Sequence, residues 1–134
     1  MRSPTGELRD DAGMTELKRA IPVLASVDLD ATQRFYSERL GFEAVARYAD
    51  YAICARDGVQ VHFWLTDDPE IPKATSCRID VDGIDELYRE LHAADVIHPN
   101  APLREQPWGL REFGVVDGDG NLITFAEPPP PPPP

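Results

Sequence analysis

One pattern occurs twice in this chain, first as Asp57-Gly58-Val59-Gln60-Val61-His62-Phe63-Trp64 and again 62 positions later (119 minus 57) as Asp119-Gly120-Asn121-Leu122-Ile123-Thr124-Phe125-Ala126. Each copy begins with an Asp-Gly turn and continues as a short apolar run, which is typical of the second strand of a hairpin. Upstream of each copy, a Val-Asp pair leads into apolar residues at helical spacing. The chain therefore contains one small unit, a strand, a helix and three further strands, used twice.

The expected boundaries follow from turn residues and periodicity. The first half predicts a helix at 31–40, capped by Asp28 or Asp30 and ended by Gly41, with strands at 20–26, 43–48, 51–56 and 59–65. The second half predicts a helix that begins at a capping box of Asp82 and Asp85, with strands at 75–81, 95–98, 110–116 and 121–127. The fold class is α+β, with two βαβββ modules forming a curved mixed sheet around a concave cleft.

The expected organisation is one domain at 20–127, made of modules at 20–66 and 75–127. Residues 1–19 are polar and aperiodic, and we expect a disordered extension there. The prolines at 128–134 have no backbone donors, so they are expected to form an extended polyproline tail. An inert tail is favoured over a ligand for an SH3-like partner.

Composition narrows the range of partners. Lys and Arg total 13 against 24 for Asp and Glu, a net charge of −11, which argues against nucleic acid and favours a cationic ligand. Such acidity also serves solubility. The chain has neither an apolar run of membrane-spanning length nor a secretory signal, so the expected location is the cytoplasm, without membrane association. Cys54 and Cys77 are expected to be buried free thiols.

Alternation along the strand at 59–65 separates two faces. Val61 and Phe63 lie on one face, which we expect the helices to cover because it is apolar. Gln60, His62 and Trp64 lie on the other face, which is expected to line the concave side. These three residues are the first candidates for a binding site.

Aromatic residues supply the other candidates. Trp64 and Trp108 are the main ones, with Tyr48 and Tyr51 behind them. A Trp ring offers a wide face for flat heterocycles or cationic groups, worth about 0.5–1.5 kcal/mol beyond area burial. The alternative for either Trp is ordinary packing in a small domain.

The chain also resembles a known superfamily. The resemblance rests on Ile21-Pro22-Val23-Leu24, on Phe35-Tyr36 with Leu40-Gly41-Phe42, on Gly83-Ile84-Asp85-Glu86-Leu87-Tyr88, and most specifically on Gln106-Pro107-Trp108-Gly109-Leu110-Arg111-Glu112-Phe113 followed by Asp119-Gly120-Asn121-Leu122. Over about residues 20–127 the chain is similar to the vicinal-oxygen-chelate superfamily, which includes glyoxalase I, extradiol dioxygenases and bleomycin-resistance proteins. The bleomycin-resistance proteins are its closest pattern.

The resemblance also locates the metal ligands of the superfamily's enzymes. The four ligand positions fall on Ile21, His62, near Ser76, and on Thr124. Only His62 is a good ligand, whereas catalytic zinc sites usually have three protein ligands. We therefore expect no metal and no other cofactor.

The resemblance implies an acidic homodimer that encloses a flat, cationic, bleomycin-like antibiotic and sequesters it without chemical change. It also implies that the strand at 20–26 is open to exchange with the partner, and that the acidic linker around Asp67 helps to attract the drug. The expected ligand contacts are Trp64, Trp108, His62, Gln60, Tyr48, Tyr51, Arg111 and Gly109.

Two alternatives remain open at this point. The first is a lyase, isomerase or dioxygenase of the same superfamily, either metal-dependent or metal-free with His62 as general base. The second concerns Arg111, for which a structural ion pair or a dimer contact is as well supported as a ligand contact.

Overall fold

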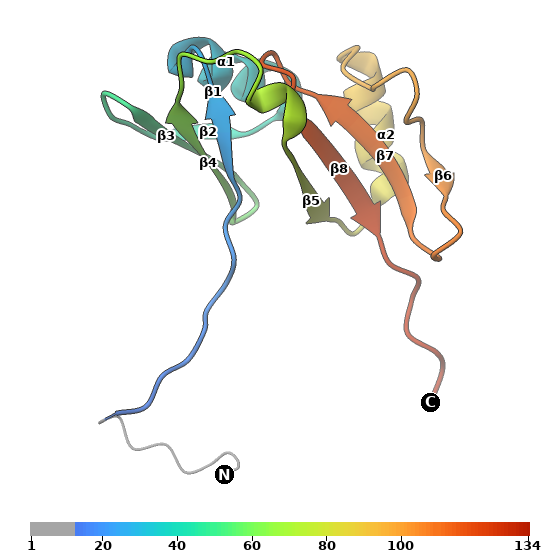
Figure 1. Ribbon diagram of the computed structural model, residues 1–134. Coiled ribbons are helices and arrows are strands. Elements are labelled where there is room, and N and C mark those ends of the chain that lie inside the picture. The colour runs from blue at the N-terminus through green and yellow to red at the C-terminus, as the bar shows by residue number, and fades with distance from the viewer. Residues whose placement is uncertain (1–12) are drawn as a thin grey trace.

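The computed structural model describes residues 13–134, which form two modules with the same element order (Figure 1). The first module contains β1 (Val23–Ser26), α1 (Leu29–Leu40), β2 (Glu43–Arg47), β3 (Tyr51–Arg56) and β4 (Val59–Leu65). A short 3-10 helix, η1 (Pro72–Ala74), leads into the second module, which contains β5 (Ser76–Asp80), α2 (Ile84–Ala93), β6 (Arg104–Glu105), β7 (Arg111–Val116) and β8 (Leu122–Glu127).

The curved sheet consists of two four-stranded sheets, one in each module. Their strand orders are β1-β4-β3-β2 and β5-β8-β7-β6, so the two topologies are identical. In each sheet the first strand pairs in parallel with the last, and the other neighbours are antiparallel. The duplicated βαβββ unit predicted from the sequence is confirmed, and β1 lies in the sheet of its own module.

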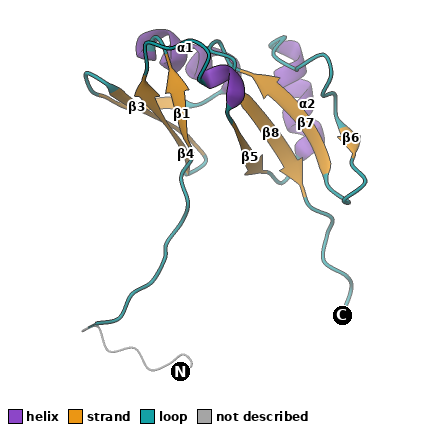
Figure 2. Ribbon diagram, viewed as in Figure 1, coloured by secondary structure: helices purple, strands orange, loops and turns teal. Residues whose placement is uncertain are grey.

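Each helix covers one face of its own sheet (Figure 2). The apolar residues of the strands turn toward these helices, and Val61, Phe63, Phe113 and Phe125 are all buried, as their alternation predicted. The opposite faces of the two sheets carry no helix. The alternation of β4 therefore assigns Gln60, His62 and Trp64 to a helix-free face.

The helix α1 and the β3–β4 hairpin form for local reasons. Asp28 is the N-cap of α1, where its side chain accepts a hydrogen bond from the backbone N–H of Ala31, and the helix begins two residues earlier than predicted. In the hairpin, Asp57 and Gly58 both have positive φ, 52° and 80°, as a two-residue type I′ turn requires. The sequence Asp-Gly predicted this turn correctly.

The capping box predicted for α2 is wrong. The N-cap residue is Gly83, in the left-handed conformation, and no side chain of its own segment caps the helix. The carboxylate of Glu127 instead accepts hydrogen bonds from the N–H groups of Gly83 and Ile84, at 3.0 and 2.8 Å. Glu127 ends β8, so the cap comes from a residue that only the tertiary fold brings to the helix.

The strand predicted at 95–98 is also wrong. Asp95 turns the chain with a φ of 59°, and only an isolated bridge between Ile97 and Val115 follows. Pro99 then has no N–H to extend the pairing. The fourth strand of this sheet is the two-residue β6 instead.

The two ends of the chain lie outside the modules. Residues 1–12 of the predicted extension are outside the described residues, and residues 13–22 run away from the modules as an extended segment (Figure 1). Residues 128–134 are exposed and belong to no helix or strand. Within residues 13–134, neither the length nor the hydropathy of any helix suffices to span a membrane.

Candidate ligand-binding site

The helix-free face of the first sheet gathers four of the predicted contact residues. In the strand register, Tyr51 of β3 is paired with Trp64 of β4, and Ile53 is paired with His62. On the other side of β4, Val23 of β1 is paired with His62, and its side chain is about half exposed. The result is a surface that combines aromatic, aliphatic and polar groups.

A hydrogen-bonded chain crosses this surface. The Tyr51 hydroxyl lies 2.8 Å from Nδ1 of His62, and the Oε1 atom of Gln60 lies 2.8 Å from Nε2 of the same ring. An amide oxygen can only accept, so Nε2 donates to Gln60; in the neutral ring Nδ1 then carries no proton and accepts that of the Tyr51 hydroxyl. The two rings also meet edge to face, with centroids 5.4 Å apart. Both nitrogens of a neutral His62 are thus engaged, and the ring is fixed in one orientation.

Trp64 stands beside this chain and remains 39% exposed. A large apolar ring kept at the surface, next to oriented polar groups, is typical of a binding surface rather than of core packing. Tyr48 lies in the β2–β3 turn, 60% exposed, and its N–H donates to the carbonyl of Tyr51. The first module therefore supplies five of the eight predicted contacts.

Trp108 and Gly109 belong to the second module, in the turn between β6 and β7. Trp108 is 64% exposed, and its indole N–H donates to Oε2 of Glu112 at 3.0 Å. Gly109 has a φ of 92°, and its N–H donates to the carbonyl of Gln106, so the turn requires the left-handed conformation there. This is a second exposed aromatic site, on a different element from Trp64.

Arg111 lies on the helix-covered side of its sheet. Its guanidinium donates two hydrogen bonds to the carboxylate of Asp85 on α2, at 2.9 and 2.8 Å. The Arg111 guanidinium lowers the pKa of Asp85, chiefly through these hydrogen bonds. The structural ion pair, one of the alternatives for Arg111, is therefore the one observed in the structure.

Two of the four positions that the resemblance matched to metal ligands, Ser76 and Thr124, lie on β5 and β8. Ser76 is exposed on β5, and Thr124 is half-buried on β8, paired with Arg78 and Gly114. Across residues 13–134, no group of three or more His, Cys, Asp and Glu side chains is arranged to hold a metal ion.

A buried polar network joins the two modules behind this surface. Asp117 accepts hydrogen bonds from the Tyr36 hydroxyl and from the side-chain amide of Asn121, at 2.8 and 3.0 Å. The same amide of Asn121 donates to the carbonyl of Ala25, the β1 residue paired with Trp64. Burial raises the pKa of Asp117, while the hydrogen bonds from Tyr36 and Asn121 act in the opposite direction. The network therefore fixes the strand that borders Trp64.

The sequence predicted a turn at residues 117–120 but not this network. The available signal was the polar pair Asp117 and Asn121 within an apolar hairpin, since buried polar residues need partners. Asp119 extends the junction, accepting from the Val27 N–H at 3.1 Å and from the Thr32 hydroxyl at 2.6 Å.

Comparison with known proteins agrees with the fold and with the duplicated unit. A family model described as glyoxalase superfamily protein matches residues 7–129, so the chain belongs to the glyoxalase superfamily. A bleomycin resistance protein of Geobacillus stearothermophilus is 35% identical over 124 residues, which cover 80% of this chain and 94% of the relative. Within the superfamily, the chain is thus a member of the bleomycin resistance protein family.

Two further comparisons support this placement. A bleomycin resistance protein of Klebsiella pneumoniae is 32% identical over 117 residues, which cover 81% of this chain and 91% of the relative. A bleomycin-binding protein from bleomycin-producing Streptomyces verticillus, crystallised with copper(II)-bleomycin, superimposes with a TM-score of 0.78 at 32% identity. That match covers 87% of this chain and all of the solved chain.

Proposed function

We propose that this protein binds a bleomycin-like glycopeptide, or a similar flat and cationic natural product, and protects by sequestration without making or breaking a bond in the drug. The observation that carries the proposal is the exposed Trp64 beside the oriented chain of Tyr51, His62 and Gln60. The membership of the bleomycin resistance protein family supports it independently.

The surface offers what a flat cationic ligand needs. Trp64 supplies a stacking face, and the neighbouring Tyr51 and His62 form an aromatic border that is fixed in place by hydrogen bonds. The net charge of −11 raises the local concentration of cations and speeds their association. Trp108 supplies a second aromatic surface, paired with the carboxylate of Glu112.

The hydrogen bonds of His62 favour binding over catalysis. A general base needs a free lone pair within reach of a substrate proton. In this structure the Nδ1 lone pair of His62 already accepts the Tyr51 hydroxyl, and Nε2 carries the proton donated to Gln60. We assign His62 the role of a fixed wall of the site.

We further propose that two chains pair to complete the site and that the protein acts in the cytoplasm. Support for pairing comes from the extended segment at 13–22, where Leu17 is 99% exposed, and from the half-exposed Val23 next to the site. An apolar side chain of this size gains from burial against a partner. The free thiols of Cys54 and Cys77 suit a reducing compartment.

The test uses the two tryptophans of the chain as separate reporters. Trp108→Phe leaves Trp64 as the only indole, and Trp64→Phe leaves Trp108. Each variant and the unmodified protein are titrated with metal-free and with copper(II)-loaded bleomycin, by fluorescence and by calorimetry. We expect submicromolar binding, corresponding to at least about 8 kcal/mol, with quenching of Trp64 in the Trp108→Phe variant.

A site variant and a measurement of oligomeric state complete the test. Trp64→Ala is expected to weaken binding about tenfold or more, because a central aromatic contact is removed. Sedimentation with and without the drug measures whether two chains carry the ligand. Absence of heat and of quenching with both forms of the drug would contradict the proposed ligand, and a monomeric complex would contradict the paired site.

A further inference from the structure

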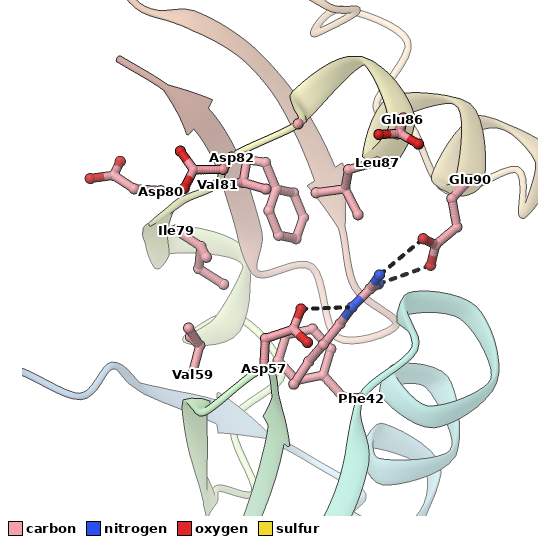
Figure 3. A pocket seen from close by; sticks show the side chains of 13 residues that line it. Phe42, Asp57, Val59, Ile79, Asp80, Val81, Asp82, Glu86, Leu87 and Glu90 are labelled. Carbon is pink, nitrogen blue, oxygen red and sulfur yellow. Dashed lines mark hydrogen bonds and ion pairs between the residues drawn. The ribbon is translucent and has the colours of Figure 1, made fainter. Parts of the chain in front are cut away.

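A cavity of about 510 Å³ lies between the two modules, away from the surface described above (Figure 3). It is bounded by the β3–β4 turn of the first module and by the start of α2 in the second. None of the eight predicted contact residues lines it. Its volume falls within the range of about 300–1,000 Å³ that is usual for small-molecule pockets.

The floor of the cavity is apolar and comes from both modules. It contains Phe42, Val59, Ile79, Val81, Leu87 and Phe125. Phe42 and Phe125 are buried in the core, whereas Val59 is 38% exposed at the opening. The floor therefore offers an apolar body of ring size a continuous surface between the modules.

One wall of the cavity is held rigid by Arg56. Its guanidinium donates to both carboxylate oxygens of Glu90 on α2, at 2.9 and 3.0 Å, and to the carbonyl of Leu40 at the end of α1. It also lies 3.7 Å from the carboxylate of Asp57, and Figure 3 shows these ion pairs as dashed lines. Five acidic residues line the cavity, and Arg56 forms ion pairs with two of them, Asp57 and Glu90.

The other acidic residues of the cavity lie on β5 and around the start of α2. Asp80 is paired with Arg78, at 3.0 Å. Asp82 and Glu86 also line the cavity, and neither makes an ion pair within residues 13–134. An apolar floor beneath two unpaired carboxylates is complementary to a molecule with an apolar body and one positive charge.

We propose that this inter-module cavity is a second binding site, for a small organic cation such as an amine carried on a compact aromatic or aliphatic body. The apolar part occupies the floor between Phe42 and Leu87, and the ammonium group faces Asp82 and Glu86. This second site contains neither Trp64 nor His62, so it can be tested independently of the proposed sequestration of the drug.

The experiment follows backbone amide signals by two-dimensional NMR while the full chain is titrated with phenethylamine. Saturable shifts are expected at Val59, Gly83 and Leu87, with the Trp64 indole signal unchanged. Three probes separate the contributions of charge and apolar body. The neutral 2-phenylethanol is expected to bind about tenfold more weakly than phenethylamine, and the anionic 3-phenylpropionate is expected not to bind. Spermidine, which lacks an apolar body, is expected to give shifts that do not saturate at these amides.

Variants test the carboxylates directly. The double variant Asp82→Asn and Glu86→Gln is expected to weaken phenethylamine about tenfold and to leave the neutral probe unchanged, because only the charge is removed. The matched control, Asp50→Asn with Asp67→Asn, removes two exposed carboxylates elsewhere and is expected to leave the affinity within about twofold of the unmodified protein, since the distant charges are screened.

Three results would overturn the proposal. The first is equal binding of the amine and the alcohol, and the second is an equal loss of affinity in the two double variants. The third is a shift of the same three amides with protein concentration when no probe is present, because a second copy of the chain would then be the occupant. Shifts at Val59, Gly83 and Leu87 that saturate with the amine and are lost in the Asp82→Asn and Glu86→Gln double variant support it.

Discussion

Tyr36 carries one of the few hydrogen bonds that join the two modules through the core. Its side chain is fully buried, and its hydroxyl donates to Oδ2 of Asp117, which is itself 5% exposed. Burial, together with the Asp117 carboxylate, raises the pKa of Tyr36 well above its ordinary value, so the hydroxyl keeps its proton and remains a donor. The substitution Tyr36→Phe deletes this donor and leaves the shape of the core unchanged.

The magnitude follows from what Asp117 retains. Its other oxygen still accepts the backbone N–H groups of residues 119–121, and Asn121 still donates to Oδ2. No carboxylate oxygen is orphaned, so the loss should fall at the lower end for a hydrogen bond to a charged group, about 1.5–2 kcal/mol. The folded body from Val23 to Glu127 has 105 residues (127 minus 23 plus 1). At about 2.1 cal/mol/K per residue, this loss lowers Tm by about 7–9 °C.

The loss should also depend on pH. Burial raises the folded pKa of Asp117 and the Tyr36 hydrogen bond opposes that rise, so removing the hydroxyl raises the folded pKa further. A raised folded pKa means that stability is complete at acid pH and is lost as pH rises through the folded pKa. The variant therefore loses more stability at neutral pH than near the ordinary carboxyl range of about 4.

The assay is urea unfolding and calorimetry at several pH values, with Tyr88→Phe as the matched control. Tyr88 packs on Phe113 with ring centroids 5.1 Å apart, and its hydroxyl makes no hydrogen bond within residues 13–134. The control should change stability by less than about 0.5 kcal/mol. Equal effects of the two substitutions, or a loss that grows as the pH falls, would refute the assignment of Tyr36 as the inter-module donor.

Three further outcomes are expected. Gly58→Ala should lower the free energy of unfolding in urea by about 1 kcal/mol, because Gly58 has a φ of 80° although the space around it is open. The control Gly118→Ala has the same open space and no positive φ, so it should leave the free energy of unfolding unchanged. Burial raises the pKa of Cys54 and of Cys77 to about 11 from 9.0, so at pH 8 native labelling by a thiol reagent should be about a hundredfold slower than in urea, and equal rates would contradict it. Arg111→Gln should leave drug affinity unchanged in calorimetry, because Arg111 pairs with Asp85 on the helix side, and a marked loss would place it in the site.

The sequence predicted the parts of this fold that depend on near neighbours. The type I′ turn at Asp57-Gly58 needs only two residues with positive φ, and the alternation along β4 needs only the pleat of one strand. Because of that alternation, the shared face of His62 and Trp64 follows from the order of residues in a single strand. The hydrogen bond between the Tyr51 hydroxyl and His62 joins two strands, and the sequence did not predict it.

The strand predicted at 95–98 failed for a local reason, the turn at Asp95 followed by Pro99. The other failures share a different physical cause, which is that a partner distant in sequence replaced a local one. Glu127 caps α2 in place of the adjacent Asp82, since the parallel pairing of β5 with β8 brings the end of β8 to the helix. Asp117 was predicted only as a turn residue, yet its carboxylate binds the first module through Tyr36. The inter-module cavity depends on Arg56 and Glu90, which lie in different modules and have no common motif.

The two copies of the repeated unit agree in residue type on one face of the sheet and differ on the other. On the helix side, the equivalent positions are occupied by residues of the same kind, Val61 with Ile123 and Phe63 with Phe125, and all are buried. On the helix-free side, the equivalents differ in kind: His62 corresponds to Thr124, and Trp64 corresponds to Ala126. The core of each module must be filled by a similar apolar volume, which explains why the buried residues on the helix side are of the same kind in both copies. In that second set Ala126 is buried, whereas His62 and Trp64 are partly exposed, so core packing does not demand an imidazole or an indole at the first module's positions. The ligand binding proposed above gives a reason for both side chains.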